Sequence, residues 1–295
     1  MQQHRTLTDW ALLLALVAMW GSAFMFNKLG VATVPPATLV AVRVAVGLLT
    51  LVVLLHVHGV RLPPAGRIWG TYAVMGIVGN ALPFYLITWG QQLVESALAG
   101  VLMAIMPLAT LVLAHFFVKG EQLTWRRSAG FALGLVGIVL LFKPALEGLA
   151  RGSHAIIYEL AVLLGALCYA ANSVLARRLV TRDFLMAAAG TLLVASVLMV
   201  PIALFVDSSW IAEPTWGSIA SIVWLGVGPT GIATILYYRL ISSAGPTFMS
   251  LVNYLNPVIA VLLGVALLGE KPGVNAYAGL TLILTGIAFS QWRRR

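Results

Sequence analysis

Residues that could carry out acid–base, nucleophilic or metal chemistry are few in this chain and do not gather in sequence. The histidines are His4, His56, His58, His115 and His154, which stand near span ends and form no His-x-x-x-His pair. Ser22, Ser173 and Ser250 have no histidine beside them. The single cysteine, Cys168, allows no intrachain disulfide. We therefore expect neither catalysis, nor a cofactor, nor a metal site.

Uncharged polar and aromatic side chains, by contrast, occur throughout the apolar stretches. Trp20 and Phe24 are four residues apart, which places them on one face of a helix beside Asn27, and Asn80 and Phe84 repeat this spacing. Asn and Tyr can hydrogen-bond carboxylate or ammonium groups, and aromatic rings and Met adapt to varied apolar groups. The predicted binding residues are Trp20, Phe24, Asn80, Phe84, Tyr85, Met103, Tyr169, Asn172, Ser173, Thr234, Tyr237, Tyr238, Asn253 and Asn256.

The alternative for each of these residues is structural, because Asn and Ser also join membrane helices and aromatic residues anchor membrane interfaces. A polar and aromatic set on several helices favours a cavity over packing alone.

Composition indicates how these residues are positioned. The chain has 295 residues, of which 61% are hydrophobic and 9% charged, whereas globular domains have about 25% charged residues. Apolar runs of about 20 residues cross a bilayer as helices. We predict an all-α polytopic membrane protein with spans at 9–29, 36–58, 67–89, 95–118, 125–142, 155–176, 184–206, 216–238, 246–268 and 273–292.

The basic residues predict the orientation of these spans. Thirteen Lys and Arg would lie on the side of the N-terminus and four on the other side, so both termini are expected to be cytoplasmic. The basic residues that give the chain its net charge of +9 therefore mark cytoplasmic loops. They do not indicate nucleic-acid binding, and no nucleic-acid partner is expected.

A repeat divides the chain into halves. The pattern Gly100…Pro107…Gly120-Glu121 recurs as Ser250…Pro257…Gly269-Glu270, about half a chain later. Five spans per unit is an odd number, so the second unit is inverted in the membrane, as in many secondary transporters. The predicted units are 1–145 and 146–295.

Four prolines stand near the middle of predicted spans: Pro83, Pro107, Pro229 and Pro257. A proline in a helix removes one hydrogen bond and bends the helix. Their symmetric placement favours hinges or a cavity lining, and the alternative is simple packing kinks.

These features together resemble the drug/metabolite transporter superfamily, EamA type. The resemblance rests on Trp20-Gly21-Ser22 through Phe24 and on the repeated Pro…Gly-Glu pattern, and it extends over essentially the whole chain. It implies a basket-like bundle in the cell inner membrane, with a central cavity lined mainly by helices one, three, four, six, eight and nine. It also implies export of small metabolites by alternating access, with amino acids well represented as substrates. Helices five and ten usually serve association or packing there, and both a monomer and a homodimer remain open.

The charged residues bear on energy coupling. Glu95 and Glu159 stand near span ends, and no Asp or Glu is expected at mid-membrane, which favours a uniporter over a proton antiporter. For Arg43, inside the second span, snorkelling or structural pairing is favoured over binding a substrate carboxylate. His115 is expected to be structural, and Glu121 and Glu270 to cap the helices that follow them.

The sequence therefore predicts a facilitator that exports small metabolites, in particular amino acids, with broad selectivity. The alternative is export of purines, nucleosides or cationic drugs by proton antiport. A channel is disfavoured because no ring of pore-lining charges is present.

Overall fold

The computed structural model describes residues 6–118, 123–149, 154–179, 184–207, 213–244, 246–249 and 251–291, and the side chains of all of these except 177–179, 238, 242, 246, 247 and 291. Secondary structure in this part of the chain is entirely helical. The helices are α1 Leu7–Val31, α2 Pro36–Val57, α3 Ile68–Gly76, η1 Ile77–Ala81, α4 Leu82–Gly90, α5 Ser96–Met103, α6 Met106–Phe117, α7 Trp125–Leu149, α8 Ala155–Leu179, α9 Phe184–Val206, α10 Trp216–Leu225, η3 Gly226–Ile232, α11 Ala233–Ala244, α12 Pro246–Met249, α13 Leu251–Leu268 and α14 Val274–Gln291.

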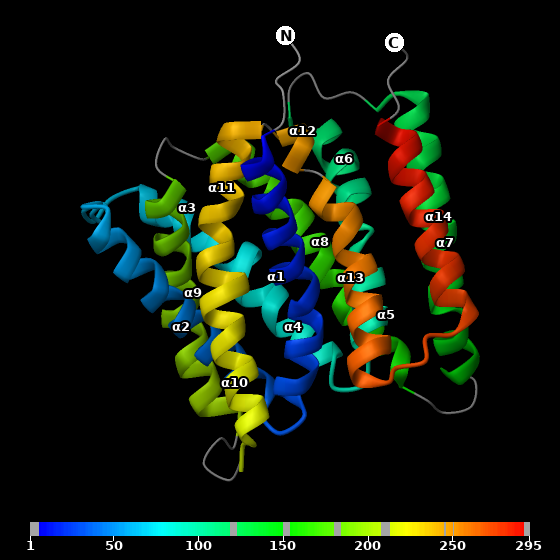
Figure 1. Ribbon diagram of the computed structural model, residues 1–295, viewed down its shortest axis with the longest axis horizontal. Coiled ribbons are helices and arrows are strands. Elements are labelled where there is room, and N and C mark those ends of the chain that lie inside the picture. The colour runs from blue at the N-terminus through cyan, green and yellow to red at the C-terminus, as the bar shows by residue number, and fades with distance from the viewer. Residues whose placement is uncertain are drawn as a thin grey trace.

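Within the described residues, nine helical stretches are long and apolar enough to cross a membrane, and Val274–Ser290 is a shorter apolar helix. The predicted all-α architecture with ten crossings is confirmed. The start of α1 and the end of α14 lie at the same end of the bundle (Figure 1), as an even number of crossings requires.

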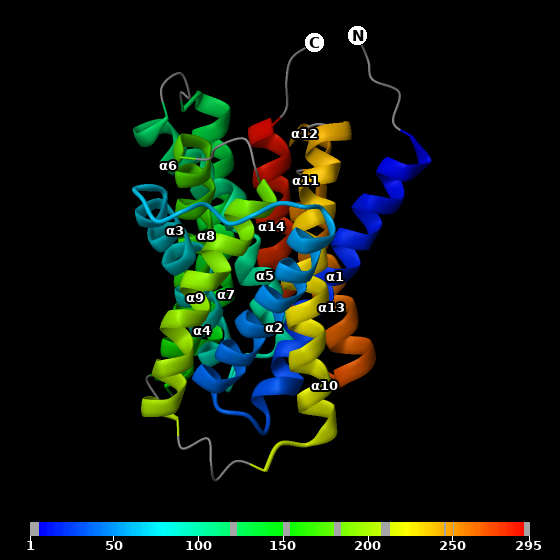
Figure 2. The ribbon, with the colours of Figure 1, turned by 90° about the vertical axis from the view of Figure 1, so that its left-hand side faces the viewer.

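The helices form one bundle with a separate pair at its side. Helices α2, α3 and α9 occupy one side of the view in Figure 1, and α7 and α14 occupy the other. Turned by 90°, the bundle has α9 and α4 toward one side and α1 and α13 toward the opposite side (Figure 2). Helix α1 packs on α13, α10 and α11, so the first helix of the first half is held mainly by the second half.

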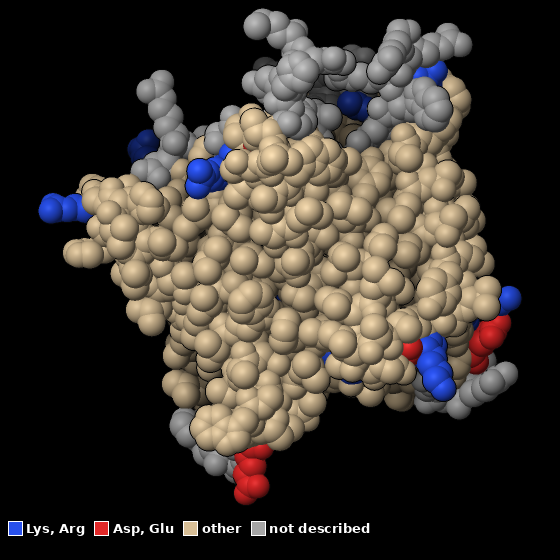
Figure 3. Space-filling model, in the orientation of Figure 1, with Lys and Arg blue, Asp and Glu red and all other residues tan. Residues whose placement is uncertain are grey.

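On the visible surface, charged side chains lie toward the two ends of the molecule. On the face shown in Figure 3, a wide belt without Lys, Arg, Asp or Glu separates the ends, and the acidic side chains lie near the end opposite the start of α1. We call this opposite end the outer end, following the orientation predicted from the basic residues. Such a belt fits a hydrocarbon environment.

The third and eighth crossings each contain a π-helical segment, η1 and η3. Pro83 follows η1 and Pro229 lies within η3. In both segments a backbone N–H reaches back five residues, from Leu82 to Ile77 and from Ala233 to Gly228. Proline lacks an N–H and its ring crowds the carbonyl four residues earlier, so the helix widens locally where each proline is inserted.

The fourth crossing is interrupted between α5 and α6. Ala104 and Ile105 donate to the carbonyls of Val101 and Leu102, three residues back, and the helix resumes just before Pro107. The sequence predicted a helix irregularity at Pro107 itself. The break falls before Pro107 because a proline disturbs the hydrogen bonds of the turn that precedes it.

Helix α7 is longer than predicted. The sequence suggested an end at residue 142 because Lys143-Pro144 follows, but the helix continues through Pro144 to Leu149. Lys143 and Glu147, at a separation of four residues, form an ion pair of 3.9 Å across this proline. Because α7 passes residue 145, the boundary between the units 1–145 and 146–295 stays a prediction.

Helices α7 and α14 pack on each other through glycines. A Cβ placed on Gly286 would collide with the carbonyl oxygen of Gly130, and one on Gly137 would lie 2.8 Å from the carbonyl oxygen of Gly279. The two backbones can approach only because these side chains are absent. Helices five and ten therefore pack within one chain, and an association role for them stays a prediction.

At the outer end, two carboxylates join the halves by capping helices. Asp207, after α9, accepts hydrogen bonds from the backbone N–H and the hydroxyl of Thr38 at the start of α2, at 2.6 and 2.9 Å. Glu270, after α13, accepts from the N–H groups of Ser96 and Ala97 at the start of α5, at 2.7 and 2.8 Å. A carboxylate at a helix N-terminus satisfies free N–H groups and opposes the positive end of the dipole.

The prediction that Glu270 caps the helix following it is wrong. Gly269 has φ +67°, a left-handed conformation that glycine adopts without strain, and this turn directs the next residue toward α5 rather than α14. Glu121 lies outside the described residues. Burial raises the pKa of the neighbouring Glu95, the Glu270 carboxylate raises it further, and Lys28 lowers it.

Replacing Glu270 with alanine should destabilise the folded protein by about 1–2 kcal/mol, because two N–H groups of α5 lose their acceptor. The measurement is thermal unfolding of the purified protein in detergent, followed by intrinsic fluorescence. Glu213→Ala is the matched control, since Glu213 is exposed outside the helices. Equal unfolding temperatures for the two variants would contradict the cap.

Candidate functional site

A cavity of about 280 Å³ lies among the helices of both halves. Its walls come from α1, α2, η1, α4, α5, α6, α8, η3, α11 and α13. Helices α7, α9, α10 and α14 contribute none of its lining residues. The cavity therefore lies between the two repeat units, where inverted-repeat transporters bind their substrates.

Most of the predicted binding residues line this cavity. These are Trp20 and Phe24 of α1, Asn80 of η1, Phe84 of α4, Met103 of α5, Tyr169 of α8, Thr234 of α11, and Asn253 and Asn256 of α13. Among the predicted hinge prolines, Pro107, Pro229 and Pro257 line it.

Other predicted residues lie elsewhere. Tyr85 packs against a core cluster formed by α2 and α9, the hydroxyl of Ser173 donates to the carbonyl of Tyr169 at 2.8 Å, and Tyr237 lies behind Trp20 with ring centroids 5.7 Å apart. Pro83 is buried outside the cavity lining. The side chain of Tyr238 lies outside the described residues.

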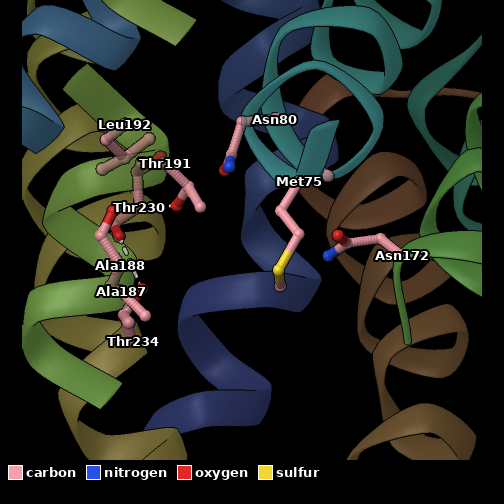
Figure 4. A pocket seen from close by; sticks show the side chains of 10 residues that line it. Met75, Asn80, Asn172, Ala187, Ala188, Thr191, Leu192, Thr230 and Thr234 are labelled. Atoms are coloured by element: carbon pink, nitrogen blue, oxygen red, sulfur yellow. Dashed lines mark hydrogen bonds between the residues drawn. The ribbon is translucent and has the colours of Figure 1, made fainter. Parts of the chain in front are cut away.

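A smaller cavity of about 140 Å³ adjoins the first and shares Gly79, Asn80, Thr230 and Thr234 with it. Asn172, a predicted binding residue, lines this second cavity. Figure 4 shows Met75, Asn80 and Asn172 directed into the space opposite Ala188 and Thr191 of α9. Met75 and Asn172 stand nearer the predicted cytoplasmic ends of their helices, so the smaller cavity lies on that side of the larger one.

The π-helical segment η3 organises one wall of the cavity. Pro229 has no N–H to donate to the carbonyl of Leu225, four residues earlier, and the hydroxyl of Thr230 donates to that carbonyl at 2.7 Å. The carbonyl of Pro229 accepts from the indole N–H of Trp20 at 3.0 Å. Proline thus creates free backbone acceptors at the cavity, and cavity side chains satisfy them.

Arg43 is part of this wall. Its side chain is only 8% exposed, its Nε donates to the Thr230 hydroxyl oxygen at 3.0 Å, and its guanidinium lies 3.8 Å from the centroid of the Phe84 ring. Snorkelling, one of the two roles favoured by the sequence, is therefore wrong, because the side chain turns into the bundle.

A second network lies toward the outer end of the cavity. Asn27 donates to the Gln91 side-chain oxygen at 2.8 Å and accepts from the Thr88 hydroxyl at 3.0 Å. The Gln91 amide donates to the carbonyl of Phe24 at 3.0 Å. Nearby, Lys28 donates to the carbonyls of Gln91 and Val94 at 2.7 and 3.1 Å. These bonds hold the end of α1 to the connection between α4 and α5.

The predicted binding set did not contain several of the lining residues, namely Asn27, Arg43, Ile87, Gln91, Met106 and Thr230. Asn27 had a sequence signal, its helical spacing from Trp20 and Phe24. Gln91 had none, because it stands at the end of a predicted span, where polar residues are ordinary. Its complete burial follows from the contact with α1.

Two cavity amides are incompletely bonded. The Asn256 Oδ1 and the Asn172 Oδ1 are buried and have no hydrogen-bond partner within the described part of the chain. A buried acceptor without a partner is costly, so each oxygen would be stabilised by a donor group brought within hydrogen-bond distance.

Comparison with known proteins decides the family. The model of the EamA-like transporter family matches the chain twice, over residues 9–143 and 156–292. The chain belongs to the EamA-like transporter family. The double match fits the repeat seen in the sequence, and the activity class is transport rather than catalysis.

Individual relatives agree with this assignment. The chain is 31% identical to the "uncharacterized inner membrane transporter YedA" of Escherichia coli K12 over 279 residues, covering 93% of this chain and 88% of that one. It is 27% identical to the "probable terminal-alkyne amino-acid exporter" of Streptantibioticus cattleyicolor, covering 94% and 91%. A chain of known crystal structure with 23% identity superposes with a TM-score of 0.68 over 96% of this chain and 97% of its own, which supports the fold.

This EamA-like transporter is a multi-pass protein of the inner membrane, as its relatives and its apolar helices indicate. Its two lined cavities lie between the two family units, and they are the candidate path for a small-molecule substrate.

Proposed function

We propose that this transporter exports small metabolites, in particular amino acids with broad selectivity, by alternating access through the central cavity and as a uniporter. The observation that carries the proposal is a cavity between the repeats that combines the unpartnered amide oxygen of Asn256 with aromatic and methionine side chains. The similarity to a probable amino-acid exporter supports the substrate class.

The size and chemistry of the cavity favour a small polar substrate. Sites for drug-sized molecules have about 300–1,000 Å³, and this cavity has about 280 Å³. The free Asn256 Oδ1 can accept a hydrogen bond from an ammonium group. Trp20 and Phe24 give flat apolar contact, and Met103 and Met106 adapt to side chains of different shape.

Alternating access needs helices that bend near the substrate. The segments η1 and η3 occupy corresponding positions of the two repeats, 149 residues apart. Pro107 and Pro257 line the cavity on α6 and α13. In this proposal the two halves rock about the cavity, and these interruptions absorb the change in backbone angles.

The test is the flux of labelled amino acids in proteoliposomes of the purified protein, without an imposed ion gradient. Saturable flux is expected, and Asn256→Leu should lower kcat/KM at least tenfold, since a hydrogen bond to a charged group contributes about 1.5–3 kcal/mol. Asn275→Leu, on α14 and away from both cavities, is the matched control. Absence of flux for every amino acid would overturn the substrate class.

Replacing Pro107 or Pro257 with alanine should lower kcat several-fold and leave substrate affinity within about twofold, because a straighter helix resists bending and the binding groups remain. The same flux assay, with binding measured separately, checks this. Pro201→Ala is the control, since Pro201 lies inside α9 and is exposed at the bundle surface. Wild-type turnover in both cavity variants would refute the hinge role.

Proton antiport is the second candidate, and Glu159 favours it. This residue lies one turn into α8, is 7% exposed, and has a buried Oε2 without a hydrogen-bond partner in the described chain. Buried carboxylates in membrane helices commonly relay protons.

If the protein is a uniporter, flux should be the same with and without an imposed pH gradient. The same should hold for the Glu159→Gln variant. The control is Glu213→Gln at the exposed outer end. Flux that rises with the pH gradient in the wild type and loses this dependence in Glu159→Gln would establish proton coupling and reject the uniporter.

A further inference from the structure

Arg43 is a buried cation at the cavity wall without an acidic partner. It stands seven residues into α2, about 10 Å along the helix axis from the first residue. It lines the cavity. Within the described residues, no ion pair joins it to an Asp or Glu.

Two described residues, Thr230 and Phe84, hold the side chain in position. The Thr230 hydroxyl donates to the carbonyl of Leu225, so its oxygen is oriented to accept from Arg43 Nε. The Phe84 ring lies against the guanidinium at 3.8 Å, a cation–π contact. The backbone of Thr230 is itself held in the π-helical segment at Pro229.

These contacts use only part of the guanidinium. Arginine has five N–H donors and is always charged in proteins, and the described chain accepts one hydrogen bond, at Nε. The two terminal amino groups have no hydrogen bond to the described residues. A hydroxyl and an aromatic ring do not neutralise a buried charge, which is costly without an anionic partner.

Resting on the proposed export function, we propose that Arg43 binds the carboxylate of the transported substrate through its two terminal amino groups. A planar pair of N–H donors matches the two oxygens of a carboxylate and gives a bidentate ion pair. The substrate class is therefore carboxylate-bearing metabolites, amino acids among them. Cationic drugs and neutral nucleosides have no carboxylate to pair with Arg43. The positive charge of Arg43 also repels cationic drugs.

The decisive experiment compares an acid with its amide. Purified wild-type protein is titrated with phenylalanine, leucine, their α-carboxamides, and a simple carboxylate such as butyrate, with intrinsic tryptophan fluorescence as readout, because Trp20 lines the same cavity. We expect each acid to bind at least tenfold more tightly than its amide. Equal binding of acids and amides, or no binding of any carboxylate, would overturn the inference.

Variants test whether the preference for acids over amides depends on Arg43. Arg43→Gln should reduce the acid-to-amide affinity ratio to about one, and Arg43→Lys, which keeps the charge and loses the bidentate geometry, should keep part of the ratio. Arg67→Gln removes an exposed arginine outside the cavity and should keep the full ratio. A preserved ratio in Arg43→Gln would overturn the inference, and if this variant does not fold, the wild-type titration decides.

Flux measurements separate this inference from the proposed function. Acids that bind with the expected preference and are not transported would refute amino-acid export and leave the carboxylate site standing. Amino acids that are transported as readily as their amides would support export and refute the role of Arg43.

Discussion

Inside a bilayer, each backbone N–H and C=O must find its partner within the protein, and this constraint organises the structure. Every described crossing is helical because a helix satisfies its own backbone. A proline breaks that self-sufficiency at a defined point. Because Pro229 has no N–H, the carbonyl of Leu225 accepts a hydrogen bond from the hydroxyl of Thr230 instead. The same hydroxyl oxygen accepts from Arg43 and positions it. One missing N–H thus leads to an ordered cavity wall.

The inverted repeat applies this constraint twice. The π-helical segments η1 and η3 occupy equivalent positions in the two halves and bring backbone irregularity to the same depth from opposite directions. Irregular backbone is tolerated in a membrane only where protein or a cavity covers it. The cavity between the repeats and the helix interruptions around it are therefore two results of one requirement.

The outer end shows how the halves are joined without large apolar interfaces between loops. Asp207 and Glu270 of the second half cap α2 and α5 of the first half. Charge-assisted bonds of this kind are shorter and stronger than neutral ones and add geometric specificity, so they fix which helix ends of the two halves meet.

The sequence alone determined the number of crossings, the inverted repeat, the family resemblance and most of the cavity side chains, because long apolar runs, a fixed offset and helical spacing are local signals. Trp20, Phe24 and Asn27 share a face by spacing, and their place in the cavity follows. Tertiary structure decided what depends on neighbours distant in sequence. Gln91 is buried because α1 covers it, Glu270 caps α5 because Gly269 turns the chain toward it, and Arg43 points inward because Thr230 and Phe84 receive it. The residues that meet Arg43 lie 41 and 187 positions away along the chain, and no local pattern connects them.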